Sequence, residues 1–170
     1  MCTRSASSFA AAIAVLAYLG GLSAWPAGAA EASAAQAAQA RRDLALASRA
    51  WLEATLQGDF SSQAEFYPER MEAFYLWRNV PKSAVMAEKR RVFAEARTID
   101  LDMESPQIIL SADARAARMY FRKTYLIDGN VRREGEVLQE LRWAKNNEGW
   151  KIVSERDLRV IRQVQKVSSH

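Results

Sequence analysis

Apolar and polar positions alternate most clearly over residues 114–156, where three consecutive segments have the pattern of long antiparallel strands. In 117–125 the odd positions are mostly apolar and the even positions mostly polar, and 137–143 alternates in the same way. A period of two is typical of a strand with one buried face. Turn sequences rich in Asn, Asp and Gly, at 128–130 and 146–149, separate the three strands.

The region before these strands has a helical pattern, and it supplies the layer against which a one-sided sheet must pack. An apolar stripe with helical spacing runs through Leu44, Ser48, Trp51, Leu52, Thr55 and Leu56. Gly58 is expected to end this helix and Asp59 to cap a short helix over 60–66. A third helix is predicted over 82–96. The chain is therefore expected to be of the α+β class.

Two further segments have weaker patterns. The aromatic-rich stretch 71–77 fits a short strand, and its Glu, Ala, Met and Leu residues keep a helix open as the alternative. In 98–111 acidic and apolar residues alternate until Pro106, and proline confines such a strand to a sheet edge or a bulge. After Asp157 we expect the chain to extend as far as Ile161 and then to fray.

The first 29 residues have the features of a secretory signal peptide. Arg4 gives a positive start, residues 9–22 are apolar, and Ala27-Gly28-Ala29 is an A-x-A cleavage sequence. The apolar run is shorter than the roughly 20 residues of a membrane-spanning helix, so an uncleaved anchor is the weaker alternative. We divide the chain into a signal peptide (1–29), a flexible lead (30–40), one domain (41–161) and a disordered tail (162–170).

Export and charge together limit the partners of the mature protein. Cleavage after Ala29 would remove Arg4 from the 24 basic residues and leave 23 basic against 20 acidic side chains, a net charge of +3. The signs are interspersed, which together with export argues against a nucleic-acid partner. Cys2 is the one cysteine and leaves with the signal peptide. We expect a periplasmic or secreted protein without disulfides and without a stable membrane span after cleavage.

Several short motifs resemble those of NTF2-like (SnoaL-like) proteins: Trp51 with Gly58-Asp59, Phe66-Tyr67, Phe121-x-x-x-Tyr125, and Gly149-Trp150-Lys151-Ile152-Val153-x-Glu155. The resemblance covers residues 40–159 and implies a cone, with N-terminal helices packed on a strongly curved, mostly antiparallel sheet. More narrowly, the chain is similar to the NTF2-like domain appended to periplasmic L,D-transpeptidases and L,D-carboxypeptidases. These 170 residues contain no transpeptidase domain with its cysteine and histidine. The resemblance therefore does not imply that activity for this chain.

The cone implies a pocket, and two polar residues fall on the apolar phase of its strands. Lys123 and Gln139 each lie between two residues of the inward phase, where they would orient an anionic or amide-bearing ligand against aromatic walls. The candidate ligand-binding residues are Tyr67, Phe74, Trp77, Phe121, Lys123, Tyr125, Gln139 and Trp143. The alternatives are that the aromatic residues are plain core and that Lys123 reaches water at the sheet end, which its long side chain favours.

The sequence gives little support to acid–base or metal chemistry. Four carboxylates are out of phase with the apolar residues and are expected on the solvent-exposed face: Asp100, Asp102, Glu104 and Glu140. His170, in the tail, is the one histidine, so neither a metal site nor a cofactor is predicted. The sequence also lacks a Ser/His/Asp set, a Gly-rich phosphate loop and a dinucleotide fingerprint.

Three functions remain open. The leading prediction is an exported, non-catalytic module that binds a small ligand or an envelope protein or polymer, in a role accessory to cell-wall metabolism. One alternative is an enzyme that moves protons in the cone through Lys123 and Tyr125, although no acid, histidine or cysteine is in phase with the pocket. The other is a homodimer that pairs through the sheet face, with Tyr120, Arg122 and Trp150 as candidate contacts.

Overall fold

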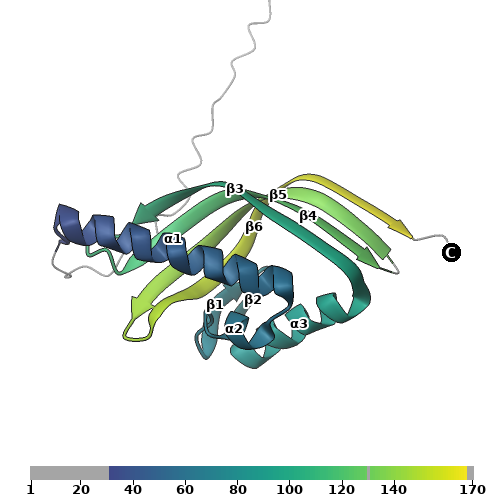
Figure 1. Ribbon diagram of the computed structural model, residues 1–170, viewed down its shortest axis with the longest axis horizontal. Helices are drawn as coiled ribbons and strands as arrows, with labels where there is room; N and C mark the ends of the chain where they lie inside the picture. The colour runs from purple at the N-terminus through teal and green to yellow at the C-terminus, as the bar shows by residue number, and fades with distance from the viewer. Residues whose placement is uncertain (1–30, 130, 168–170) are drawn as a thin grey trace, which may run out of the picture.

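The alternating segments form one six-stranded sheet, and the helices pack on its concave side (Figure 1). The computed structural model describes residues 31–129 and 131–167. The expected signal peptide therefore lies outside the described residues. The elements are α1 (Ala34–Gln57), α2 (Phe60–Ala64), β1 (Arg70–Phe74), β2 (Trp77–Pro81), α3 (Lys82–Glu95), β3 (Ala96–Leu110), β4 (Ala116–Gly129), β5 (Val131–Asn146) and β6 (Gly149–Val167).

The strand order is β2-β1-β6-β5-β4-β3, and β1 pairs in parallel with β6 while the other neighbours are antiparallel. The four long strands arch over α1, with α2, α3 and the β1–β2 hairpin beneath the arch (Figure 1). This confirms the α+β class and the curved, mostly antiparallel sheet.

The first helix begins earlier than the sequence pattern indicated. The segment 30–40, expected to be a flexible lead, is helical from Ala34. Ser33 caps the helix in a capping box with Gln36, and the Ala and Gln residues that follow favour helix without needing an apolar stripe. An apolar pattern alone could not show this extension.

In the segment 71–77, residues 71–74 belong to β1 and Trp77 begins β2, so the strand alternative is correct. This segment forms most of a tight hairpin in which β1 pairs with β2 and Tyr75, at the turn, has a positive φ of 51°. The sequence did not indicate β2. The turn brings Tyr75 against the middle of the sheet, where its backbone N–H donates to the carbonyl oxygen of Glu155 at 2.7 Å.

The sequence predicted the edge strand β3 correctly but not the C-terminal end of β6. β3 is an edge strand, and its register shifts between Glu104 and Gln107, on either side of Pro106, as proline requires. The expected tail from residue 162 is instead part of β6, which pairs with β5 as far as Val167 opposite Val131. The tail is ordered as a strand because β5 is long enough to pair with it, and the local sequence of the tail does not reveal that partner.

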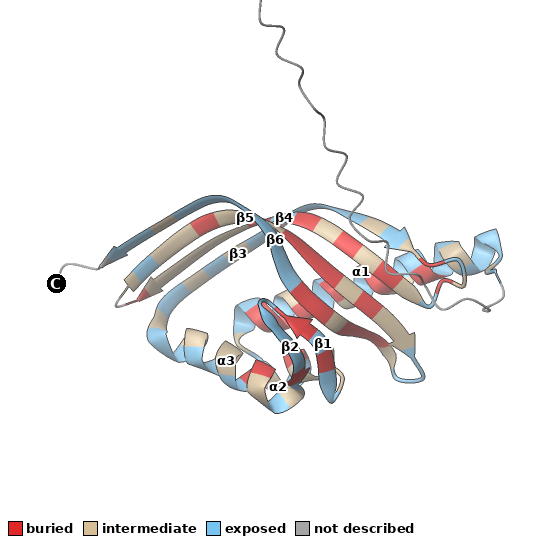
Figure 2. Cartoon of the chain, turned by 180° about the vertical axis from the view of Figure 1, so that it is seen from behind, coloured by how far each residue is buried: buried red, intermediate tan, exposed pale blue. Residues whose placement is uncertain are grey.

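The core lies between α1 and the middle of the sheet. Its largest fully buried apolar side chains are Leu44, Tyr67, Met71, Phe74, Met119, Leu141, Trp143 and Ile152. Buried positions are concentrated where the strands pass over the helices, and the strand ends near the C-terminus are more exposed (Figure 2). The sheet therefore has a well-packed half and an overhanging half.

We predict that Gly58→Ala will lower the free energy of unfolding by about 1 kcal/mol, because Gly58 has a left-handed φ of 65° at the end of α1. A Cβ there would also lie 3.0 Å from the ring of Phe93. Urea denaturation measures the change. Gly58→Asn is the matched control, because asparagine adds the same Cβ but tolerates this backbone conformation better. Equal losses in the two variants would contradict a conformational cause.

Candidate functional site

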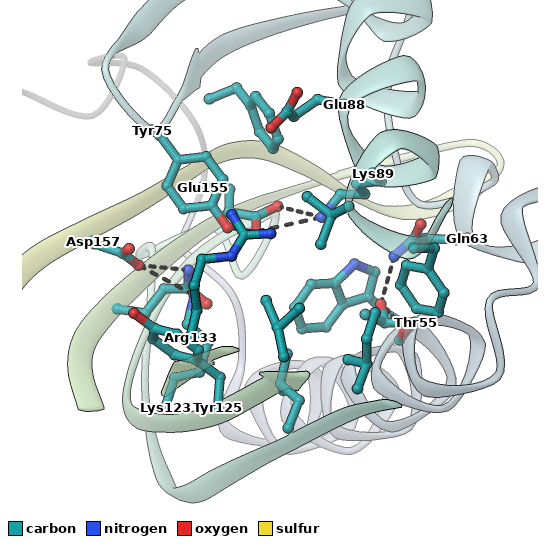
Figure 3. Close-up of a pocket in the computed structure, with 18 of the residues that line it drawn as sticks. Thr55, Gln63, Tyr75, Glu88, Lys89, Lys123, Tyr125, Arg133, Glu155 and Asp157 are labelled. Atoms are coloured by element: carbon teal, nitrogen blue, oxygen red, sulfur yellow. Dashed lines mark hydrogen bonds and ion pairs between the residues drawn. The ribbon is translucent and has the colours of Figure 1, made fainter. Parts of the chain in front are cut away.

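A cavity of about 300 Å³ lies under the overhanging half of the sheet, between β3–β6, α3 and the β1–β2 turn (Figure 3). Its apolar walls include Trp51, Phe74, Val92, Phe93, Ile99, Leu101, Tyr125 and Ile127. Its polar lining comes from every layer of the fold: Thr55, Gln63, Tyr75, Glu88, Lys89, Lys123, Arg133, Gln139, Glu155, Asp157 and Gln163.

Glu155 of β6 accepts hydrogen bonds from three side chains at the cavity. The residue is 2% exposed. Its Oε2 atom accepts a hydrogen bond from the hydroxyl of Tyr67 at 3.1 Å, and its Oε1 atom accepts one from the hydroxyl of Tyr75 at 3.1 Å. The ammonium of Lys89 lies 3.2 Å from Oε2 and 3.4 Å from Oε1. One buried carboxylate therefore joins the sheet to α3, to the hairpin turn and to the segment after α2.

Lys89 reaches Glu155 from the apolar face of α3. It follows Val85 by four residues and precedes Phe93 by four, which places it on the side of the helix that faces the sheet. Its Nζ atom lies 5.4–5.8 Å from the ring centroids of Trp51, Tyr67 and Phe74. Aromatic faces stabilise a cation at this range, so the site holds the ammonium by charge and by ring contacts.

A bulge in β6 turns Glu155 inward. Trp143 of β5 is opposite Ile152, but Leu141, two residues earlier, is opposite Glu155 rather than Ser154. The extra residue in β6 reverses the alternation at this point. In a regular strand, residues 152 and 155 lie on opposite faces. Without the bulge, Glu155 would therefore lie on the outer face, because Ile152 faces the core.

The pKa of Glu155 lies below its ordinary value of 4.5. Burial raises this pKa, but the charges of Lys89 and Lys123 and the hydrogen bonds from Lys89 and Tyr75 outweigh the effect. Burial and the Glu155 charge together raise the pKa of Tyr67 and of Tyr75 well above 10. Tyr75 keeps 37% of its surface exposed, yet its hydroxyl points to Glu155 (Figure 3). Both tyrosines therefore act as hydrogen-bond donors to a carboxylate.

A second carboxylate of β6, Asp157, organises the neighbouring part of the cavity. Its Oδ1 atom accepts hydrogen bonds from Nε2 of Gln139 at 2.9 Å and from Nζ of Lys123 at 3.3 Å. Lys123 also lies 5.6 Å from the ring of Tyr75 and 5.9 Å from that of Tyr125. Lys123 is 7% exposed, so the expectation that it reaches water at the sheet end is wrong. The carboxylate and the two rings retain the ammonium inside.

Three buried polar atoms in the cavity lining have no hydrogen-bond partner among the described residues. They are Oε1 of Gln63, Oε1 of Gln139 and Nε of Arg133. Gln63 is 1% exposed and Gln139 is fully buried. Buried polar atoms without partners are costly, so a water molecule or a ligand group that reached one of these three atoms would be stabilised.

The structure places the eight candidate residues in three different environments. Phe74, Lys123, Tyr125 and Gln139 line the cavity. Tyr67, Phe121 and Trp143 are buried core residues outside the cavity lining, and Tyr67 supports the site through Glu155. Trp77 on β2 is 56% exposed, because the hairpin turns it away from the cavity. Lys123 and Gln139 therefore point inward as predicted. Of the predicted aromatic residues, Phe74 and Tyr125 line the cavity and the other four do not.

The expectation that no acid is in phase with the pocket is wrong, since Glu155 and Asp157 both line it. Asp100, Asp102 and Glu104 are exposed as predicted. Glu140, expected in solvent, is buried at 9% exposure because its cross-strand neighbours Tyr120 and Arg156 cover it. A signal for Lys89 was present in the sequence, because a lysine in the centre of an apolar helix face needs a partner.

Neither a metal site nor a membrane span is found in the part of the chain that the structure describes. Within 31–129 and 131–167, no group of three or more histidine, cysteine, aspartate or glutamate side chains is arranged to hold a metal ion. No helix in the same ranges is long and apolar enough to cross a membrane.

Comparison with known sequences decides the family. Residues 40–156 match the model of the calcium/calmodulin dependent protein kinase II association domain. The chain belongs to this family. The family has the NTF2-like fold, in agreement with the cone described above. A search of curated proteins found no match to this chain.

Solved structures agree on the fold. Bd1075 from Bdellovibrio bacteriovorus has a TM-score of 0.59 and 18% identity over 72% of this chain, which spans 41% of that protein. A putative NTF2-like dehydratase from Streptomyces avermitilis has a TM-score of 0.58 and 16% identity, covering 68% of this chain and 91% of that one. The hexachlorocyclohexane dehydrochlorinase LinA-type3 from Novosphingobium barchaimii LL02 has a TM-score of 0.65 and 10% identity, covering 81% and 97%. These likenesses show the NTF2-like fold.

We predict that Glu155→Gln will lower the free energy of unfolding at pH 7 by about 3 kcal/mol, since it leaves the Lys89 ammonium buried without a counter-ion. Chemical denaturation measures the loss. Glu148→Gln is the matched control, because Glu148 forms an ion pair with Lys151 at 3.1 Å but is 75% exposed. Its effect should stay within about 0.5 kcal/mol. A loss as small for Glu155→Gln would show that the buried pair does not stabilise the fold.

The same pair predicts a pH dependence. Because the pKa of Glu155 is lower in the folded protein than the ordinary 4.5, its contribution to stability is complete above that value. The contribution is lost as the pH falls through the folded pKa. The difference in unfolding free energy between wild type and Glu155→Gln should therefore become smaller as the pH is lowered from 7 to 3. A constant difference across this range would contradict the assignment.

Proposed function

We propose that this protein is an exported, non-catalytic NTF2-like module that binds a small ligand in the cavity beneath its sheet. The observation that carries the proposal is the coincidence of a cavity of about 300 Å³ with three buried polar atoms that have no partner among the described residues. A mostly apolar pocket with a few convergent polar groups is the usual form of a small-molecule site.

Binding is favoured over proton transfer by the state of the ionisable groups. Glu155 and Lys89 satisfy each other, as do Asp157 and Lys123. An ammonium held in an ion pair has no free lone pair with which to accept a proton, so Lys123 is poorly suited to act as a base. The enzyme alternative would need substrate to break one of these pairs. The named dehydratase and dehydrochlorinase that share the fold are similar in architecture only.

The cellular setting of the proposal is the envelope. Its support is the signal-peptide pattern of residues 1–29 and the similarity to the NTF2-like domain of periplasmic L,D-transpeptidases and L,D-carboxypeptidases. In that setting the module would be accessory to cell-wall metabolism, and its partner would be a small molecule, an envelope protein or an envelope polymer.

A homodimer is the second candidate, and exposed apolar residues on β6 favour it. Leu158, Val160 and Ile161 are 43%, 55% and 45% exposed. Among the described residues, β6 beyond Glu155 pairs with β5 alone, which leaves its other edge open. Of the contacts first considered for pairing, Arg122 is exposed but Trp150 is buried in the core. Light scattering coupled to size exclusion measures this state.

We predict that native mass spectrometry of the protein, isolated from the exported fraction of the cells that make it, will show a polypeptide that begins at Ala30 with a small molecule retained. Lys123→Met should lose the retained mass, because it leaves Asp157 in the cavity lining without its counter-ion and so disrupts the site. Lys145→Met is the control, because Lys145 is paired with Asp43 outside the cavity lining.

The two readouts of this experiment are independent. A wild-type protein that carries only its polypeptide mass would contradict ligand binding, whatever its N-terminus. A mass that includes residues 1–29 would contradict export through a cleaved signal and would leave the ligand result unaffected.

A further inference from the structure

We propose that the ligand of this cavity is uncharged and carries an amide group. The inference rests on the proposed function, that the cavity binds a small molecule, and it specifies the chemical class. Two observations support it: the charged side chains of the lining are already paired with one another or with neighbours, and three buried polar atoms of the lining have no partner among the described residues.

The charges in the lining are balanced before any ligand enters. Lys89 pairs with Glu155 at 3.2 Å and Lys123 pairs with Asp157 at 3.3 Å. Glu88, the third carboxylate of the lining, pairs with Arg91 at 2.6 Å. A charged ligand would lose its hydration without gaining a free counter-ion, which is unfavourable in a buried site.

Arg133 is the remaining charge, and its guanidinium lies 3.8 Å from Glu95. That pair lies at the solvent side, since the Glu95 side chain is 49% exposed. The Nε–H group of Arg133 is buried and has no acceptor among the described residues. What this atom requires is a single acceptor oxygen, which a neutral carbonyl provides.

The orientation of Gln139 is fixed by its neighbour. The carboxylate of Asp157 can only accept, so the Nε2 atom of Gln139 must face it, and the Oε1 atom must face away. This oxygen has no donor among the described residues. A ligand N–H is the group that would satisfy it.

The same reasoning applies to Gln63 on the other side of the cavity (Figure 3). The hydroxyl of Thr55 donates to the carbonyl of Trp51 at 2.8 Å, so it accepts from Nε2 of Gln63 at 2.6 Å. The Oε1 atom of Gln63 is left without a donor. The side chains that line the cavity thus contain two buried acceptors and one buried donor without partners among the described residues, the complement of a group that contains both N–H and C=O.

The probes are acetanilide, its ester analogue phenyl acetate, and benzoate, each titrated into uniformly ¹⁵N-labelled protein and followed by amide and side-chain NMR shifts. Acetanilide and phenyl acetate have the same acetyl group and phenyl ring, but the ester lacks the N–H and its carbonyl oxygen is the weaker acceptor. We expect acetanilide to bind roughly threefold to tenfold more tightly than phenyl acetate, as one satisfied hydrogen bond allows, and benzoate to bind most weakly.

Two variants connect these affinities to the named atoms. Gln139→Leu should reduce the preference for the amide over the ester, because it removes the acceptor. Arg133→Met should weaken both acetanilide and phenyl acetate, because both present a carbonyl oxygen. Arg132→Met is the matched control, since Arg132 is the exposed neighbour on the opposite face of β5 and pairs with Glu134. It should change neither affinity.

Three results would overturn the inference. Tighter binding of benzoate than of acetanilide would show that the ligand class is an anion, with Arg133 as its counter-ion, and not an amide. Equal affinity for amide and ester would show that water already satisfies Gln63 and Gln139. No shift at cavity residues with any probe would also exclude the amide class. In each case the retained mass in native mass spectrometry decides separately whether the cavity binds a small molecule at all.

Discussion

The carboxylate of Glu155 is the interaction on which the arrangement of this molecule depends. It receives hydrogen bonds from Tyr67, Tyr75 and Lys89, which belong to three separate segments, each far from Glu155 in the sequence. Its own strand, β6, lies between β1 and β5. Charging a group at this depth is costly, and the cost is offset by these donors together with the charge of Lys123. The helices, the hairpin and the sheet are thereby fixed relative to one another.

This constraint explains why a cavity persists under the sheet. Packing would ordinarily close a space of about 300 Å³, because interiors are as dense as organic crystals. Here α3 is held at Glu155 through Lys89, and the hairpin turn is held there through Tyr75, so neither can move inward without breaking a buried pair. The space beyond them, toward Asp157 and Gln139, remains open to a ligand.

Periodicity in the sequence was enough to predict the long strands and the inward phase of Lys123 and Gln139, and the resemblance to NTF2-like proteins implied the curvature of the sheet. Periodicity failed where one residue breaks the period. The bulge in β6 reverses the phase between Ile152 and Glu155, and a strict alternation places that carboxylate on the wrong face. Local patterns also missed β2, whose partner lies across a tight turn. Lys89 was accessible to sequence reasoning, because a lysine on an apolar helix face implies a buried acid elsewhere.

The most direct test of the account is a crystal structure of the protein isolated with whatever it retains from its native compartment. The account predicts electron density for a small molecule in the cavity, within hydrogen-bond distance of Oε1 of Gln139, and an intact pair between Lys89 and Glu155. A cavity closed by its own side chains, with Lys89 turned to solvent and Glu155 bonded elsewhere, would contradict both the constraint and the site that it maintains.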